Sequence, residues 1–156
     1  MDCKTLILLL ISSGTFVLIG ASAGGNYWLD LGSYYSGLWR DCGSVFGVIV
    51  CGKIDFKDVA SWLHATRAFA VIAVLASGVG ALISLVRLCK EMDGKIVGIM
   101  FMVAAVCMVT ALSIFTSKLV DNIEDVKDVD WGWSYILGWI GAILAFVCTV
   151  LACVLK

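Results

Sequence analysis

The sequence predicts an all-α membrane protein, a bundle of four transmembrane helices that carries a small extracellular antiparallel β-sheet. The 156 residues are 62% hydrophobic and only 15% charged, and four stretches, 5–29, 68–86, 96–117 and 131–155, contain no charged side chain. About 20 apolar residues are enough for a helix to cross the hydrocarbon core. The sheet is predicted by residues 28–51, which are more polar and rich in strand formers.

Composition limits the class of protein further. A soluble domain of this size needs far more charge to cover its surface. The formal net charge of −1 suggests no nucleic-acid partner. We therefore expect residues 1–156 to form a single four-span domain whose first partner is the lipid bilayer.

The first span is expected at about 6–25. Its apolar run continues to Leu29, which is longer than the 7–15 residues usual for the core of a cleaved signal peptide, so we expect this helix to be retained. Gly20 and Gly24 form a small-xxx-small pattern, which lets two helices approach closely in lipid. We interpret it as tight packing inside the same bundle, with a homodimer contact as the alternative.

The first outer loop is expected at 26–63, and it opens on aromatic residues typical of the water boundary. Residues 34–39 suggest one strand and 45–51 another, with Gly43 and Ser44 as the turn between them. A lone hairpin is marginal in water. A disulfide that closed the loop from Cys42 to Cys51 would add about 2.5–3 kcal/mol.

The second span is expected at 65–88, with Arg67 one turn inside its outer end. An arginine at that depth is costly unless it is paired or reaches the interface. We interpret it as a structural residue that reaches loop carbonyls or an acid such as Asp30 or Asp41; a pore or ligand role is the alternative. His64, the only histidine, has no neighbouring acid or thiol that would indicate a metal site.

A short cytosolic turn at 89–95 leads to the third span, 96–117, and the fourth span is expected at 133–155 behind an aromatic anchor. The second outer loop, 118–132, carries five acidic and two basic residues. Its apolar spacing suggests a short helix that continues the third span. The acids lack the spacing of a calcium loop, so we expect a solvated acidic face, with cation attraction or partner recognition as the alternative.

Four spans place both termini on one side of the membrane. The short segments on that side carry five basic and three acidic residues. This density of basic residues favours a cytosolic location for both termini. We expect the membrane to be the plasma membrane. Cys42 and Cys51 would then lie on the oxidising side. Cys3 and Cys89 would be cytosolic thiols, with palmitoylation as the alternative.

The residues Trp28, Gly37-Leu38-Trp39, Cys42 and Cys51 resemble the W–GLW–C–C signature of the claudin superfamily, which includes the peripheral myelin protein and the epithelial membrane proteins. Residues 65–69 and 133–139 are similar to the lens fibre membrane intrinsic protein and epithelial membrane protein branch. The resemblance extends over nearly the whole chain in topology.

This resemblance implies a claudin-like bundle with a disulfide between Cys42 and Cys51. It also implies that Trp39 packs where the sheet meets the membrane, that Arg67 braces the top of the bundle, and that copies associate side by side or head to head. Only eight residues separate Trp28 from Gly37, fewer than is usual in claudins. The shorter interval argues against a paracellular pore.

We expect a non-enzymatic structural and cell-adhesion protein, located at cell junctions, that assembles laterally or between apposed membranes. Self-association is the expected mode, with another membrane protein as a further partner. The candidate contact residues on the outer side are Tyr34, Tyr35, Phe46, Asp121, Glu124 and Asp125.

Two other functions fit the same sequence. An auxiliary subunit of an ion channel would share the motif at 37–42. A paracellular ion pathway would use Asp55, Asp58 or the second-loop acids to select cations. An enzyme is not expected, because no catalytic Ser/His/Asp set or metal-spaced cluster is present; we therefore expect no catalytic residue, cofactor or metal.

Overall fold

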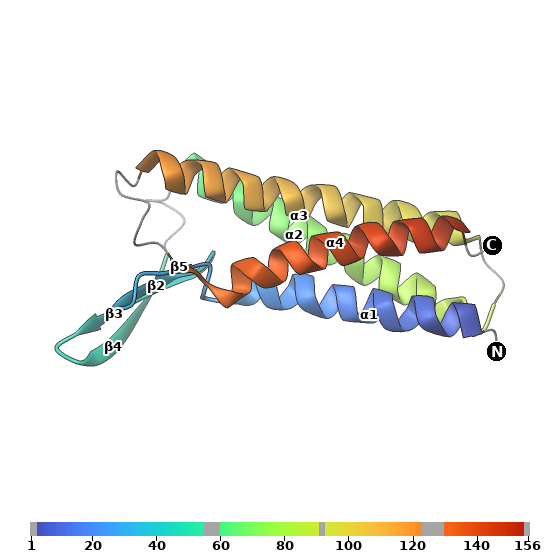
Figure 1. The fold of residues 1–156 in the computed structure, drawn as a ribbon, viewed down its shortest axis with the longest axis horizontal. Coiled ribbons are helices and arrows are strands. Elements are labelled where there is room, and N and C mark those ends of the chain that lie inside the picture. The colour runs from blue at the N-terminus through green and yellow to red at the C-terminus, as the bar shows by residue number, and fades with distance from the viewer. Residues whose placement is uncertain (1–2, 55–59, 91–92, 123–129, 155–156) are drawn as a thin grey trace.

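The computed structural model describes residues 3–54, 60–90, 93–122 and 130–154. Four long helices run side by side (Figure 1): α1 (Cys3–Gly24), α2 (Ser61–Val86), α3 (Gly94–Asn122) and α4 (Trp133–Val154). Each is long and apolar enough to cross a membrane. The predicted bundle of four membrane helices is therefore confirmed, with α3 extending five residues beyond the predicted end of its span.

Small side chains line the inside of the bundle, where α1 and α3 each pack against both α2 and α4. The buried residues of α4 that have small side chains are Ser134, Gly138, Gly141, Ala142, Ala145 and Ala152. Many large aliphatic residues point outward, as Leu75 on α2 and Ile143 on α4 do. Leu8, Ile19 and Leu112 are exceptions that are buried inside the bundle. Such an arrangement suits lipid, because helices there associate by close packing and not by the hydrophobic effect.

The outer sheet contains five short strands: β1 (Leu29–Asp30), β2 (Tyr34–Ser36), β3 (Arg40–Val45), β4 (Val48–Lys53) and β5 (Asp130–Trp131). Their order is β4-β3-β2-β1-β5, and every neighbouring pair is antiparallel. This confirms the predicted small antiparallel sheet. Strand β5 comes from the second outer loop, so the sheet joins both outer loops, which the sequence did not predict.

The turn between the longest strands lies elsewhere than predicted. Gly43 and Ser44 are inside β3 and pair with β4, so the prediction of a turn there was wrong. Of the predicted strand at 34–39, only Tyr34–Ser36 form a strand, β2, and residues 37–39 belong to the connection to β3. The chain turns at Phe46 and Gly47, which have φ angles of 51° and 80°. Two positive φ angles are typical of the tight hairpin turn that matches the strand twist, but a bulky residue rarely adopts one, which hid the turn.

The β3–β4 hairpin extends past the outer ends of α1 and α4, while the start of α1 and the end of α4 lie at the opposite end of the bundle (Figure 1). The strands β1 and β5 stay close to the helices. The sheet therefore has a base against the bundle and an end that projects away from it.

Candidate functional site

Two tryptophans complete the outer end of α1. The last carbonyls of a helix have no partner within the helix itself. The indole Nε1 of Trp28 donates to the Ser22 carbonyl at 2.8 Å, and that of Trp39 donates to the Ala23 carbonyl at 2.7 Å. These neighbouring carbonyls lie in the last turn of α1. Both motif tryptophans therefore cap the same helix end.

Arg67 connects α2 to this point. Its side chain is only 3% exposed, and its Nε donates to the Leu38 carbonyl at 2.6 Å. Its Cζ lies 5.2 Å from the centroid of the Trp39 ring, within cation–π range. A loop carbonyl is thus one partner of the guanidinium, and Arg67 holds the motif loop against the helix.

Gly37 is required by a close backbone approach. A Cβ added there would lie 2.6 Å from both the Asn26 Cα and the Gly25 carbonyl oxygen. Gly132, just before α4, is similar, because its Cβ would collide with the Tyr27 carbonyl. Backbone atoms cannot move aside as the end of a flexible side chain can. These two glycines therefore let the sheet lie directly on the helix ends.

An aromatic cluster fills the space beneath the sheet. The Trp28 ring is fully buried, and it meets Phe115 edge-on with centroids 5.0 Å apart. Tyr135 stacks on Trp131 at 4.4 Å, and its hydroxyl lies 2.7 Å from Thr116 Oγ1. The sequence did not single out Phe115 or Thr116, because both look like ordinary residues of an apolar span. We call the contacts around Trp28, Trp39 and Arg67 the junction.

The disulfide between Cys42 and Cys51 is confirmed. The two residues are direct partners across β3 and β4, with Cα atoms 4.1 Å apart. The bond closes a loop that contains the whole end of the hairpin. Cys89 and Cys153 are free and exposed, near the opposite end of the bundle.

The predicted contact residues of the first loop differ in their surroundings. Tyr35 is half-buried and stacks on Tyr27, with centroids 4.2 Å apart and planes 7° from parallel. A side-chain hydrogen bond with Tyr35 raises the pKa of Tyr27. Tyr34 is more exposed, its hydroxyl lies 3.5 Å from an Asp41 carboxylate oxygen, and partial burial raises the pKa of its phenol. Tyr27 and Tyr34 therefore stay protonated at neutral pH.

Phe46 is the most exposed of these residues, at 102% of its reference area. Its apolar neighbours Val45, Val48, Ile49 and Val50 are 53–63% exposed. No charged residue occurs from position 42 to position 51. We call residues 45–50 the hairpin tip. It is an apolar surface on the part of the sheet farthest from the bundle.

The second outer loop is described only in part. Asp121 is exposed and forms an ion pair with Lys118 at 3.2 Å, which neutralises part of the predicted acidic face. Glu124 and Asp125 lie outside the described residues, as do Asp55 and Asp58 of the first loop. The predicted continuation of the third span as a helix is seen as far as Asn122.

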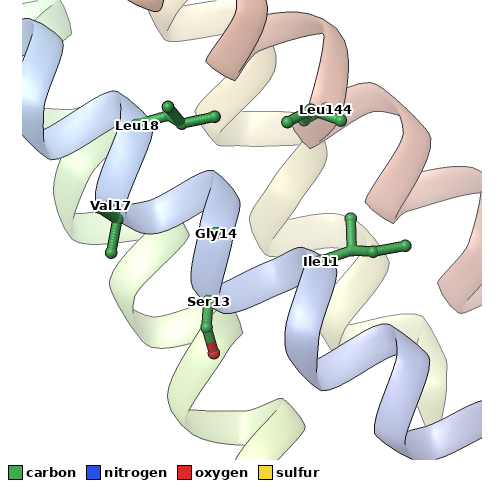
Figure 2. A pocket seen from close by; sticks show the side chains of 6 residues that line it. All are labelled: Ile11, Ser13, Gly14, Val17, Leu18 and Leu144. Carbon is green, nitrogen blue, oxygen red and sulfur yellow. The ribbon is translucent and has the colours of Figure 1, made fainter.

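A shallow cleft of about 550 Å³ lies within the membrane part of the bundle, between α1 and α4 (Figure 2). Its lining is apolar except for Ser13, and Leu144 faces it from α4. Such a surface fits an acyl chain or a neighbouring helix, because it offers almost no polar group for a soluble substrate. The arrangement gives no chemistry for catalysis.

Gly20 and Gly24 of α1 border open space and not a neighbouring helix. A Cβ added at Gly20 or Gly24 would meet nothing within 4 Å among the described atoms. The interpretation that this pair packs inside the bundle was therefore wrong. Glycines of α4 do so instead, since a Cβ on Gly141 would lie 2.8 Å from Ile19 Cγ1. The open face of α1 leaves contact with a second copy as the remaining interpretation.

The described part of the chain holds no candidate metal site. Within it, no three His, Cys, Asp or Glu side chains lie close enough to hold a metal ion. His64 sits half-buried in the first turn of α2. The residues that the structure brings together are thus those of the junction and the hairpin tip.

Comparison with known proteins matches the chain to one family over nearly its whole length. The model of the PMP-22/EMP/MP20/Claudin family covers residues 1–152. The human lens fiber membrane intrinsic protein is 30% identical over 85% of this chain and 79% of its own length. Human epithelial membrane protein 1 is 25% identical over 96% and 94% of the two chains. The p53 apoptosis effector related to PMP-22 from Danio rerio is 26% identical over 98% and 84%.

Proposed function

We propose that this chain, which belongs to the PMP-22/EMP/MP20/Claudin family, joins neighbouring copies or apposed membranes through its outer sheet. The family consists of structural membrane proteins and not of enzymes. A structural role also agrees with the sites described above, which are built from aromatic, glycine and aliphatic residues. The proposal adds adhesion as the specific task of this chain.

The exposed hairpin tip is the observation that carries this proposal. Residues 45–50 present five apolar side chains to the outside, at the point of the sheet farthest from the bundle. Contiguous apolar surface of this kind marks an interaction site. An apolar projection on the outer side is what adhesion requires.

Strand β4 supports side-by-side assembly. It is one edge of the five-stranded sheet, and all six of its residues are exposed. Natural proteins usually protect such an edge with charges, prolines or bulges. Here Lys53, at the end of the strand, is the one charged residue of β4. A second copy could pair with this edge, while the open face of α1 at Gly20 and Gly24 offers close helix contact within the membrane.

The orientation that this function needs is also a proposal. The Cys42–Cys51 disulfide forms in an oxidising compartment, which supports placing the sheet outside the cell. The start of α1 and the end of α4 lie at the other end of the bundle (Figure 1), so both termini would be cytosolic. We place the protein in the plasma membrane, at contacts between cells.

Liposome aggregation by the reconstituted protein tests this function. We expect protein-bearing liposomes to aggregate, as measured by turbidity and light scattering, and the double variant Cys42→Ala/Cys51→Ala to aggregate far less, because the hairpin loses its cross-link. The matched control is Cys89→Ala/Cys153→Ala, which removes two cysteines from the opposite end of the bundle. Monomeric protein and dispersed liposomes with the wild-type chain would refute the proposal.

A further inference from the structure

We propose that the hairpin tip, residues 45–50, inserts into the lipid of the apposed membrane. This inference rests on the proposed adhesive function. It specifies that the tip binds the boundary between headgroups and acyl chains of a facing bilayer, and not a protein receptor. Five features of the tip support lipid as the occupant.

The first feature is that both faces of the tip are apolar. Successive residues of a strand point to opposite faces. Val48, Ile49 and Val50 are nevertheless all apolar and 57–63% exposed. A sheet that docks on a protein or on its own core covers one face and leaves the other polar. Lipid can contact both faces of the hairpin at the same time.

The second feature is the residue at the apex. Phe46 and Gly47 form the turn, with φ angles of 51° and 80°. Asparagine or aspartate suits the first of these positions far better, both for the backbone and for contact with water. The chain carries a fully exposed phenylalanine there instead. Large aromatic side chains have a strong preference for the apolar environment, and they anchor proteins at membrane surfaces.

The third feature is the size of the tip. Its five apolar side chains offer roughly 350 Å² in all, at about 100 Å² for a fully exposed side chain and with exposed fractions of 53–102%. A stable protein–protein interface buries about 800 Å² on each partner. The tip alone is therefore too small for a specific protein contact. Insertion into lipid has no such minimum, since each buried side chain contributes independently.

The fourth feature is the match between the tip and the depth of an interface. The Gly43–Val50 pair lies three residues back from the apex along each strand, or about 10 Å at 3.3 Å per residue. Interfacial segments enter a bilayer by about 5–10 Å. Farther back, the exposed side chains of Arg40 and Lys53 are direct partners across the strands. They lie about 20 Å behind the apex, so these two cations act on an anionic facing surface by longer-range attraction and not by contact with its phosphates.

The fifth feature is direction. The hairpin leads away from the outer ends of α1 and α4 (Figure 1), so its tip points away from the bilayer that holds the bundle. The bilayer in its path is that of the facing membrane. Insertion at headgroup depth also leaves water within reach of the backbone of β4, which has no strand partner on its outer side among the described residues.

The test uses the full chain in nanodiscs, mixed with protein-free liposomes of phosphatidylcholine and phosphatidylserine at 7:3 and separated by flotation. We expect the wild-type nanodiscs to float with the liposomes and empty nanodiscs to stay behind. Phe46→Asn should lower the binding constant at least about tenfold, through the loss of one large apolar side chain. Because asparagine tolerates a positive φ, this variant should unfold at a temperature no lower than the wild type.

Phe46→Trp is the matched control. It should keep binding, and its additional fluorescence should be quenched by brominated lipid placed only in the protein-free liposomes. Equal binding by Phe46→Asn and the wild type would overturn the inference, as would an unquenched tryptophan at position 46.

A third arm replaces the protein-free liposomes with liposomes that carry the protein. If the nanodiscs float only with the protein-bearing liposomes, the tip binds a second copy and not lipid. That result would overturn lipid insertion but would still agree with the proposed adhesive function. No flotation in either arm would overturn both. Flotation with protein-free liposomes that depends on Phe46 supports the inference.

Discussion

Replacing Gly37 with alanine should destabilise the fold by about 2–3 kcal/mol. The new Cβ would lie 2.6 Å from the Asn26 Cα and from the Gly25 carbonyl oxygen, so this backbone would have to move by nearly 1 Å to reach ordinary contact. Overpacking of this kind costs about 1–3 kcal/mol. The shift also strains the Arg67–Leu38 hydrogen bond next to it, at about 1 kcal/mol. Restricting the unfolded chain returns only about 0.4–1 kcal/mol.

Thermal unfolding in detergent micelles measures this cost, and a loss of that size corresponds to a Tm about 5–10 °C lower. Tryptophan fluorescence is a suitable signal, because Trp28 and Trp39 both lie at the junction. The matched control is Gly43→Ala in β3, where an added Cβ would meet only the Tyr34 ring, at an ordinary 3.6 Å. Equal Tm values for the two variants would refute the close approach at Gly37 as the reason for glycine in the motif.

Three further predictions follow from the same contacts. Trp39→Phe should destabilise by about 1–2 kcal/mol, because the Ala23 carbonyl loses its donor; Trp133→Phe, half-exposed on α4, should change the Tm little. Reducing the disulfide should make the amide hydrogens of β4 exchange roughly 100-fold faster, because the cross-link contributes about 2.5–3 kcal/mol to the stability of the hairpin. Equal acceleration across α3 would instead indicate global unfolding. Gly20→Ile/Gly24→Ile should weaken the association of copies in the membrane, as measured by energy transfer between labelled chains. The control is Leu82→Ala on the lipid face of α2. Unchanged transfer in the glycine variant would contradict contact through α1.

The four helices could be predicted because lipid imposes a simple rule on composition. A charge-free run of sufficient length leaves little choice but a spanning helix. The ends of the helices depart from that rule where the chain enters water. Helix α2 begins at Ser61 and α3 continues to Asn122, beyond the apolar runs, because hydrogen bonding and not hydropathy decides where a helix ends.

The sheet could be predicted only as a tendency. Strand β5 has two residues and pairs with β1 across about 100 positions of sequence. Two residues are too few to show an alternating pattern. The hairpin turn was hidden for another reason, since Phe46 is not a turn residue and Gly43-Ser44 is. The direct pairing of Cys42 with Cys51 fixes the register of β3 and β4. This register places the turn at Phe46-Gly47, in spite of the turn preference of Gly43-Ser44.

The motif tryptophans illustrate what sequence reasoning cannot supply. Trp28 and Trp39 were expected at the membrane boundary, as aromatic residues commonly are. Their specific role is to donate to the Ser22 and Ala23 carbonyls. Backbone acceptors are the same at every position of a sequence, so nothing in it marks which carbonyls need a partner. A helix end near an indole is visible only once the chain is folded.

In the adhesive function that we propose, the junction and the hairpin tip meet two requirements with different residues. The junction fixes β1 and β2 to the helices through Trp28, Trp39 and Arg67, all of them at least partly buried. The tip is exposed and contributes little to that packing. Substitutions at Gly37 should therefore lower stability and contact together, whereas substitutions at Phe46 should lower contact alone. In the proposed contact with a facing membrane, force on the tip would pass to the bundle through the Cys42–Cys51 disulfide and then through the junction.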